Sequence, residues 1–487
     1  MSESRPAAVI ILAAGEGKRM KSRTPKVLHA LCGRSMLGHA LAAARDLDPE
    51  RLVAVVGHAR DQVAPEVARL EPQAAIVVQE QQLGTGHAVR MVTEAAGVID
   101  GVVVVTYGDM PLLRSQTLQE LVDAHRANGN AATVLTAKAA DPHGYGRVVR
   151  DDSGAFLRIV EDADATPEQR SIQEINSGCY AFEGALLADA IKRVATNNAQ
   201  SQEYLTDVLD ILRGEGHPIG SVVAADAGEI QGVNDRVQLA TARRELNDRL
   251  LRGHMLNGVT VVDPATTWVD VTVTIGQDAE IRPNTQLIGD TSIGEGALVG
   301  PNCLLEDTRV GAEAELLNVV SRRASIGAKA TLGPNVYLRP ETVIGDGAHV
   351  GCHVEVKKST VGPGAKVPHL TYVGDATIGA GANIGAGTIF ANYDGQRKWP
   401  TAVGENAFVG SNTVLIAPVT VHDGAYTAAG SAICEDVEAG DLGIARGRQH
   451  NSDGWVLRNR DGAPSAATAR RARSGALAKG DIPEPPA

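Results

Sequence analysis

The chain has few aromatic residues, few cysteines and no long apolar run. Aromatic side chains make up 3% of the 487 residues whereas glycines number 53, a balance that excludes a large aromatic core and favours closely packed, repetitive backbone. The five cysteines are scattered without metal-ligand spacing, which argues against a zinc site and suits reduced thiols in a cytosol. The apolar stretch Ala7–Leu12 is too short to cross a bilayer and no signal peptide precedes it, so we expect a cytoplasmic protein.

The chain also has fewer basic than acidic residues. The chain carries 46 Lys and Arg against 58 Asp and Glu, a formal net charge of -12, which argues against nucleic acid or an anionic membrane as the main partner. Local clusters of Lys and Arg can still bind small anions. The length predicts two or three domains.

A glycine-rich turn follows the first apolar stretch. It reads Leu12-Ala13-Ala14-Gly15-Glu16-Gly17-Lys18-Arg19-Met20 and is followed by Pro25-Lys26. Glycines at the end of a strand let backbone N–H groups approach a nucleotide without a side-chain clash. Such a turn also occurs as a plain strand-to-helix connection, but Arg19 and Lys26 add cationic donors for a triphosphate and favour nucleotide binding.

The first half of the chain alternates short apolar runs with helical patterns. Strands separated by helices indicate a parallel sheet covered on both faces, as in Rossmann-like α/β domains. Ligands bind such sheets beyond the carboxyl ends of the strands, where the chain has Gly15 and Tyr107-Gly108-Asp109. The expected strands are Val9–Leu12, Leu52–Val56, Ala75–Val78, Val102–Thr106 and Thr133–Lys138, and the expected helices lie near Met36–Ala44, Asp61–Leu70, Gly86–Ala96 and Gln116–Ala127.

From about Trp268 an aliphatic residue recurs every six positions, often with a glycine after it. Neither an α-helix nor a flat sheet has this period, whereas it suits a solenoid whose flat faces each take six residues. We therefore predict a parallel β-helix, which in hexapeptide-repeat proteins winds left-handed against the usual crossover preference. The repeat runs in four phases: Val269, Ile275, Ile281, Leu287, Ile293, Val299, Leu305; Ile326, Leu332, Leu338, Ile344, Val350, Val356; Ile378, Ile384, Phe390; and Val403, Val409, Leu415, Val421, Thr427, Ile433.

Three segments lie between or beyond these regions. Residues 236–256 have the composition of a polar helix that links two domains. The hexads break at Ala391–Ala402, where Asn392-Tyr393-Asp394-Gly395 begins an insertion; this is either a tolerated surface loop or, as we favour, part of a binding face. The tail, residues 458–487, is rich in Ala, Arg, Ser, Gly and Pro without periodicity and is predicted to be disordered.

Together these motifs resemble the bacterial family of bifunctional UDP-N-acetylglucosamine pyrophosphorylases/glucosamine-1-phosphate N-acetyltransferases over residues 6–457. The resemblance implies a uridylyltransferase domain over residues 1–235, the linker helix over 236–256 and a left-handed β-helix N-acetyltransferase domain over 257–457. The markers are LAAGEGKRM with PK, QLGTGHA, YGDMPL, GYGR, EINSG and GVN in the first half, and VEVKK, HLTYVGDA, NIGAGT, NYDG and the hexads in the second.

The resemblance also implies the residues of the first site. A sugar-1-phosphate oxygen would attack the α-phosphorus of UTP in line, while Mg²⁺, Arg19 and Lys26 neutralise the developing charge. Outside the resemblance, Gln79 and Glu161 would be interpreted as surface residues and Asp109 as a turn residue or helix cap. The implied residues are Leu12, Ala13, Ala14, Gly15, Gln79, Gly84 and Thr85 for the uridine nucleotide, Gly146, Glu161 and Asn176 for the N-acetylhexosamine, flanked by Tyr107 and Gly108, and Asp109 and Asn234 for Mg²⁺.

For the second site the resemblance implies acetyl transfer from acetyl-CoA to glucosamine-1-phosphate. His369 would be the general base that takes the proton of the attacking amine, and no cysteine is needed as an acyl carrier. A lone histidine is usually structural and an isolated cation on a solenoid is usually solvated, but here the cations fall in successive coils. The implied residues are Arg339 and Lys357 for the phosphate, Tyr372 and Asn383 for the sugar, and Ala386, Asn392, Tyr393, Ser411, Ala429 and Arg446 for acetyl-CoA.

Members of the resembled family form homotrimers, and their product feeds peptidoglycan and lipopolysaccharide precursors. The same domains would also suit a plain nucleotidyltransferase whose β-helix only drives assembly, or a non-catalytic sensor or scaffold. The set His369, Lys357 and Asn392 argues against the first alternative, and Arg19, Lys26, Asp109 and Asn234 argue against the second.

Overall fold

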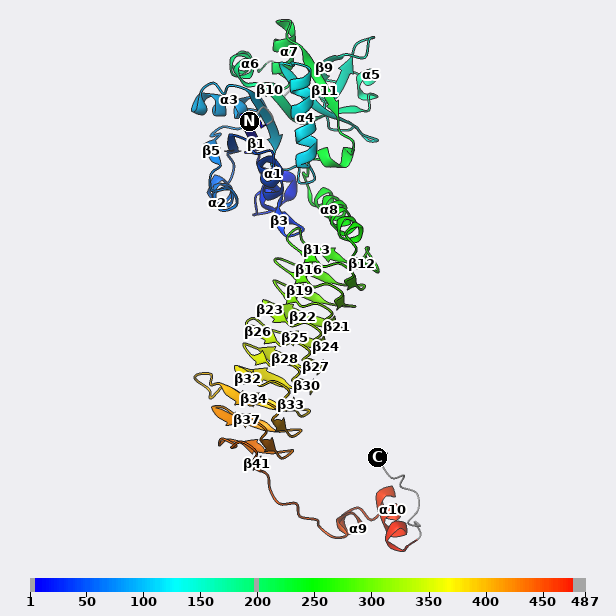
Figure 1. Cartoon of the computed structure of the whole chain (residues 1–487). Coiled ribbons are helices and arrows are strands. Elements are labelled where there is room, and N and C mark those ends of the chain that lie inside the picture. The colour runs from blue at the N-terminus through cyan, green and yellow to red at the C-terminus, as the bar shows by residue number, and fades with distance from the viewer. Residues whose placement is uncertain (1–4, 197–200, 476–487) are drawn as a thin grey trace.

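The computed structural model describes residues 5–196 and 201–475. An α/β domain lies at one end of a long column of stacked coils, and a single helix, α8 (Arg236–Leu256), lies at the junction between them (Figure 1). Among the described residues, no helix is long and apolar enough to cross a membrane.

The α/β domain is built on a nine-stranded sheet with the order β11-β7-β10-β6-β1-β4-β5. At its centre, β1 (Ala8–Ala13) pairs in parallel with β4 (Arg51–Val56) on one side and β6 (Val102–Tyr107) on the other, and β5 (Ala75–Val78) pairs with β4. The strand order reverses at β1 and β6, so their carboxyl ends open a crevice where ligands bind in such sheets.

Helices cover both faces of this sheet, as expected. Along β1, Val9 and Ile11 enter one core layer with α1 (Met36–Arg45), α2 (Arg60–Leu70) and α4 (Ser115–Ala127). Ile10 and Leu12 enter the other layer with α3 (Thr85–Ala96), α6 (Gly184–Ala190) and α7 (Asp207–Gly214). The alternation follows from the two-residue period of a strand, and it confirms the predicted strands and helices.

The expectation of a parallel sheet is wrong at two strands, β10 (Glu174–Glu183) and β9 (Phe156–Val160). The long strand β10 (Glu174–Glu183) runs antiparallel between β6 and β7 (Ala132–Lys138), while β11 (Ile219–Val223) pairs with β7 in parallel. The strands β8 (Arg147–Arg150) and β9 (Phe156–Val160) extend the sheet beside β10, and the short helix α5 (Pro167–Arg170) follows them. A buried strand is apolar in either direction, so the sequence pattern does not reveal its orientation.

The second domain is a left-handed parallel β-helix, as the hexads predict. Its coils run from β12 (Thr260–Val261) to β41 (Leu442–Gly443) and build three parallel sheets of eleven, ten and nine strands, which we call by those numbers. The predicted inward residues, for example Ile281, Leu287 and Ile293, form one continuous apolar core. At the corners the coils touch: a Cβ on Gly294 would lie 2.5 Å from the backbone nitrogen of Ala312, so only glycine fits there.

Helix α8 closes the first coil and ties it to the α/β domain. The buried Asn247 side chain donates to the carbonyl of Thr267 at 2.9 Å and accepts from the N–H of Val269 at 3.0 Å. On the other side, Leu239, Ala242 and Leu246 of α8 pack with buried residues of the α/β domain in one cluster. A solenoid exposes apolar side chains at its ends, and α8 covers them at this end.

The tail departs from its prediction in part. Two helices, α9 (Trp455–Asn459) and α10 (Pro464–Arg473), lie away from the coils (Figure 1). Pro464 occupies the first turn of α10 and is followed mainly by Ala and Arg, which are strong helix formers, so local propensity accounts for the helix. Residues 476–487, for which disorder is also predicted, lie outside the described residues.

Candidate active sites

A cavity of about 260 Å³ opens at the carboxyl end of β1. Gly84, at the start of α3, has φ +119°, and a Cβ there would lie 2.3 Å from the carbonyl oxygen of Glu203. Glycine is therefore required for this wall of the cavity. The cavity is lined by the whole predicted nucleotide set: Leu12, Ala13, Ala14, Gly15, Lys26, Gln79, Gly84 and Thr85, with Tyr107 and Asp109 at one side.

The Gln79 side chain is buried and fixed within this cavity. Its Nε2 donates to the carbonyl of Gly84 at 3.0 Å and lies 3.0 Å from Nδ1 of His87. With the amide nitrogen engaged, the carbonyl oxygen is the group that can accept a hydrogen bond from a ligand. The surface interpretation of Gln79 is therefore wrong, because its side chain is 3% exposed.

A second cavity of about 530 Å³ adjoins the first and shares Thr85, Tyr107 and Asp109 with it. The predicted hexosamine residues Gly146, Glu161 and Asn176 line it. Asn176 donates from Nδ2 to the Tyr180 hydroxyl at 2.8 Å and accepts from the Gly178 N–H at 2.9 Å, so its amide is held in one orientation. Gly108 lies at the end of β6 and donates its N–H to the Leu12 carbonyl at 2.9 Å.

The predicted metal ligands meet where the two cavities join. The Lys26 ammonium donates to the Asp109 carboxylate, and to Oδ1 of Asn234 at 3.1 Å. Two hard oxygen donors thus converge on one cation, which is a donor set that suits a divalent metal bound mainly through substrate phosphates and water. Among residues 5–196 and 201–475, no group of three or more His, Cys, Asp or Glu forms a separate metal cage.

Several acidic residues lie near Glu161, which lines the second cavity. Burial, with Asp164 and Asp207 nearby, raises the pKa of Glu161. Burial and the charge of Asp210 raise the pKa of Asp207 to about 6. A buried carboxylate among like charges loses solvation and gains no counter-ion, so these acids bind protons more tightly than in water.

We expect Asp207→Asn to stabilise the protein at high pH only. In the wild type, the folded state binds the Asp207 proton more tightly than the unfolded chain does, so protonated Asp207 contributes fully to stability below about pH 4 and this contribution is lost as the pH rises through about 6. The asparagine stays neutral and does not lose it. The shift corresponds to about 3 kcal/mol, which solvent screening and the favourable amino-terminal end of α7 reduce to about 1 kcal/mol. Calorimetry should give a Tm about 1–2 °C above wild type at pH 8 and no difference at pH 4. The exposed Asp189→Asn is the control, and an equal Tm shift at both pH values would contradict the assignment.

Arg19 is not brought into either cavity. It lies exposed on the short 3₁₀ helix η1 (Lys18–Met20) and makes no side-chain hydrogen bond or ion pair with another described residue. In turn, sequence reasoning missed Gln82, Gln202 and Tyr204, which line the cavities from loops. Gln82 begins the marker QLGTGHA, which pointed to its segment, whereas Gln202 and Tyr204 lie in a loop without periodicity.

In the β-helix, the predicted phosphate and sugar residues of the ten-stranded sheet are stacked. Arg339 follows β25 (Val336–Leu338), Lys357 ends β28 (Glu355–Lys357) and Tyr372 begins β31 (Tyr372–Gly374). These strands are consecutive neighbours, so the three side chains come from successive coils on the same face. Lys357 Nζ donates to Asp375 at 3.0 Å, and Arg339 Nη1 donates to Glu355 at 3.1 Å.

The insertion loop adds two polar groups to this face. The Asn392 side chain is buried and donates to the Asp375 carboxylate, with the Tyr372 hydroxyl at 3.5 Å. Although burial raises the pKa of Asp375, the hydrogen bonds from Lys357 and Asn392 hold it below its usual range. Lys398, which sequence reasoning missed, lies close enough to Lys357 for that ammonium to lower its pKa.

The predicted base and most of the predicted acetyl-CoA residues lie along one corner of the eleven-stranded sheet. His369 ends β30 (Lys366–His369), and its carbonyl accepts from the N–H of Gly387, next to Ala386. In the coils below, the Asn412 N–H donates to Ala386 and the Gly430 N–H donates to Ser411, both between adjacent corners. Arg446 then donates to the carbonyl of Ala429 at 2.9 Å. His369, Ala386, Ser411, Ala429 and Arg446 therefore form one line of mostly small residues down the corner.

The predicted acetyltransferase residues are divided between two sheets. His369 and Asn383 of β33 (Asn383–Ile384) belong to the eleven-stranded sheet, whereas Arg339, Lys357 and Tyr372 belong to the ten-stranded one. Tyr393 is exposed on the insertion loop, where its hydroxyl donates to the Gly395 carbonyl at 2.6 Å.

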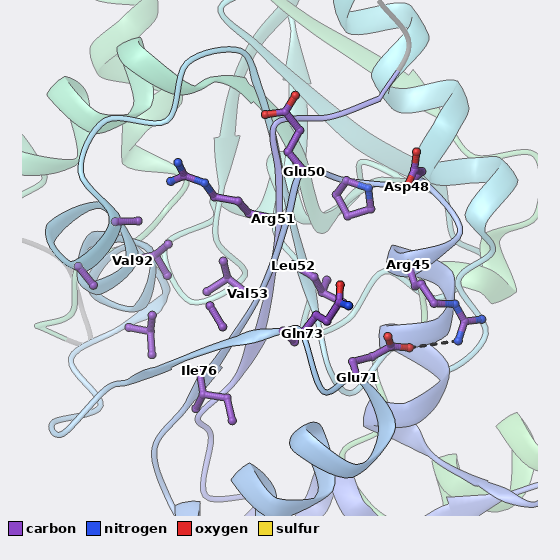
Figure 2. Close-up of a pocket in the computed structure, with 16 residues that line it drawn as sticks. Arg45, Asp48, Glu50, Arg51, Leu52, Val53, Glu71, Gln73, Ile76 and Val92 are labelled. Atoms are coloured by element: carbon purple, nitrogen blue, oxygen red, sulfur yellow. Dashed lines mark hydrogen bonds and ion pairs between the residues drawn. The ribbon is translucent and has the colours of Figure 1, made fainter. Parts of the chain in front are cut away.

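A larger cavity of about 580 Å³ lies at the amino-terminal edge of the α/β sheet (Figure 2). Arg51–Val53 of β4, Ile76 of β5 and Val92 of α3 line it, and the Arg45–Glu71 ion pair of 3.1 Å closes one side. No predicted site residue lines this cavity, so the motifs and this cavity lie at opposite ends of the strands.

The fold and the two sites define a two-domain transferase, with a nucleotidyltransferase α/β domain and a hexapeptide-repeat β-helix. A family model described as a MobA-like NTP transferase domain matches residues 9–177, and one described as bacterial transferase hexapeptide (six repeats) matches residues 272–307 and 323–358. The Bifunctional protein GlmU of Streptomyces avermitilis is 60% identical over 471 residues, covering 96% of this chain and 98% of that protein. Those of Thermobifida fusca and Corynebacterium diphtheriae are 57% and 50% identical over 478 residues, each covering 97% of this chain and 99% of the relative. The chain belongs to the GlmU family of bifunctional proteins.

Family membership confirms the two activities expected from the motifs. The α/β domain is a uridylyltransferase and the β-helix is an acetyltransferase, and the chain serves cell-wall precursor synthesis. Nucleotidyltransferases of this family use a divalent metal, and a hexapeptide β-helix is a fold that favours oligomerisation.

Proposed function

We propose that uridylyl transfer takes place where the two cavities meet, with Lys26, Asp109 and Asn234 beside the transferred phosphate. The observation that carries this proposal is the convergence of the Asp109 carboxylate and the Asn234 amide oxygen on a single cation, the Lys26 ammonium. The uridine nucleotide would occupy the cavity of Gln79 and Gly84, with the Gln79 carbonyl oxygen accepting from the uracil N3–H.

N-acetylglucosamine-1-phosphate would occupy the adjoining cavity. Its phosphate would face Asp109 at the shared wall, and its sugar would lie against Gly146, Glu161 and Asn176. Because Asn176 is already held by two hydrogen bonds, it can position a sugar oxygen with little further loss of rotamer freedom. The sugar phosphate would then attack the α-phosphorus of UTP in line, and pyrophosphate would leave.

The divalent metal of this site would be Mg²⁺, held by Asp109 and Asn234. When bound, Mg²⁺ neutralises the phosphate oxygens around the transferred group. Lys26 would then turn from Asp109 to the phosphates, and the exposed Arg19 side chain would reach toward the leaving pyrophosphate.

Acetyl transfer would use the lower coils of the β-helix. Arg339, Lys357 and Lys398 would hold the phosphate of glucosamine-1-phosphate, while Tyr372 and Asn383 would contact the sugar. The corner line from His369 to Arg446 would carry acetyl-CoA, since its small side chains leave room for the pantetheine arm. His369 would take the amine proton as the nitrogen attacks the thioester.

A homotrimer would complete this second site. His369 and Asn383 stand on one sheet and the cations on the next, so a neighbouring β-helix could bring the two sets together. In support, Phe408 and Tyr426 stack at 5.2 Å on the eleven-stranded sheet and are 40% and 50% exposed, as expected for side chains that a second copy covers. We place the enzyme in the cytoplasm, where UTP and acetyl-CoA are available as small-molecule substrates.

Mass spectrometry of the products tests the proposed reaction order. With glucosamine-1-phosphate, UTP and Mg²⁺, we expect UDP-N-acetylglucosamine only when acetyl-CoA is added, because acetylation precedes uridylyl transfer. UDP-glucosamine formed equally well without acetyl-CoA, and no acetylated product with it, would instead indicate a plain nucleotidyltransferase. No pyrophosphate under any condition would favour a scaffold.

A further inference from the structure

A buried carboxylate lies behind the uridylyltransferase site without lining either cavity. The Glu229 side chain is 1% exposed and accepts from four donors of one helix end. Its Oε1 accepts from Nε of Arg114 at 2.6 Å and also from Nη2, while its Oε2 accepts from the Arg114 backbone N–H at 3.3 Å and from the Thr117 hydroxyl at 2.5 Å. All these groups donate, so the site fits an anion.

These contacts join the two segments that carry the proposed metal ligands. Arg114 and Thr117 lie at the start of α4, five and eight positions after Asp109. Glu229 lies in the 3₁₀ helix η4 (Ala227–Ile230), five positions before Asn234. The Val233 N–H also donates to the Asp109 carbonyl at 2.9 Å. The segments 109–114 and 229–233 are therefore cross-linked at both ends, by this hydrogen bond and by the Arg114–Glu229 ion pair, and they form a closed ring next to Asn234.

We propose that Glu229 is a positioning residue that sets the separation of Asp109 and Asn234 for the divalent metal; this rests on the proposed metal site. The carboxylate faces the amino-terminal end of α4, where the helix dipole and the Arg114 guanidinium both favour negative charge. An amide in its place would turn an N–H toward one of these donors and loosen the ring. Groups that hold metal ligands in place commonly change metal affinity by about 10–100-fold when mutated.

Glu229→Gln tests the proposal with a binding readout and a kinetic one. Electron paramagnetic resonance of Mn²⁺, titrated in the presence of UDP-N-acetylglucosamine, should show a dissociation constant raised about tenfold. The Mg²⁺ concentration for half-maximal uridylyl transfer should rise similarly, while kcat at saturating Mg²⁺ stays within about threefold of wild type. The control is Glu94→Gln, which breaks the exposed Arg90–Glu94 pair on α3 and should change neither value.

If Glu229→Gln folds poorly, a substitution of Arg114 tests the same ion pair. The Arg114 side chain is 44% exposed, so its replacement disturbs the core less than replacement of the buried Glu229. Arg114→Gln should weaken Mn²⁺ binding, and Arg114→Lys, which keeps the charge, should restore most of it. Acetyltransferase activity in the same molecule reports folding. Wild-type Mn²⁺ affinity in a folded Glu229→Gln or Arg114→Gln variant would overturn the positioning role.

An Asp109→Asn variant distinguishes a wrong assignment of the metal site from a wrong positioning role for Glu229. If Asp109→Asn keeps wild-type Mn²⁺ affinity, the metal is held elsewhere and the proposed function is wrong at that point. If Asp109→Asn abolishes Mn²⁺ binding while the Glu229 and Arg114 variants keep it, only the positioning role is wrong.

Discussion

Asp109→Ala or Lys26→Ala should abolish uridylyl transfer, by about 10²–10³-fold or more, and leave acetylation at the wild-type rate. Asp109 is the only carboxylate that contacts the Lys26 ammonium within the described residues, and the two cavities meet at its side chain. Removing either partner leaves the other without its counter-charge at the point where phosphate charge must be neutralised. Pyrophosphate release measures the first activity, and thiol release from acetyl-CoA measures the second.

The control for this pair is Asp123→Asn on the far end of α4, which should alter neither rate. Near-ultraviolet circular dichroism reports whether the mutant chain is folded, independently of either activity. If both activities fall together in a folded Asp109 or Lys26 variant, the two sites are not separate.

His369→Ala should abolish acetylation and leave uridylyl transfer unchanged. Loss of a general base typically costs about 10²–10⁴-fold, so acetylation should stop on the assay's time scale while uridylyl transfer continues. His369 heads the corner line of small residues; it is exposed and its ring makes no hydrogen bond with another described residue, so the substitution removes no side-chain hydrogen bond. The measurement is acetyl-CoA turnover with glucosamine-1-phosphate at saturating concentrations.

His349→Ala is the matched control, because His349 stands on the same eleven-stranded sheet but bonds to Thr331 at 2.7 Å. It should leave acetylation near wild type. Near-normal acetylation by His369→Ala would remove His369 from the role of base and direct attention to the polar groups around Asp375.

The sequence alone determined the repeated and local features of this protein. One inward aliphatic residue in every six, as at Ile281, Leu287 and Ile293, is enough to define the coils, because each coil repeats the same short-range geometry. The apolar strand before Gly15 and the motifs at strand ends likewise predicted where the cavity beside β1 lies, since parallel strands bring their carboxyl ends to one edge. Family-specific residues such as Gln79, Glu161 and Asn176 followed from resemblance rather than from any pattern.

Only the tertiary structure decided which distant groups meet. Lys26 and Asn234 are separated by 208 positions, yet their side chains lie 3.1 Å apart. Three further features also depend on tertiary packing: the antiparallel direction of β10, the approach of Lys398 to Lys357 and the Glu229–Arg114 ion pair. Periodicity reports which face of an element is buried, because burial acts on each residue separately. Contacts between loops depend on how the whole chain packs, and no local pattern encodes them.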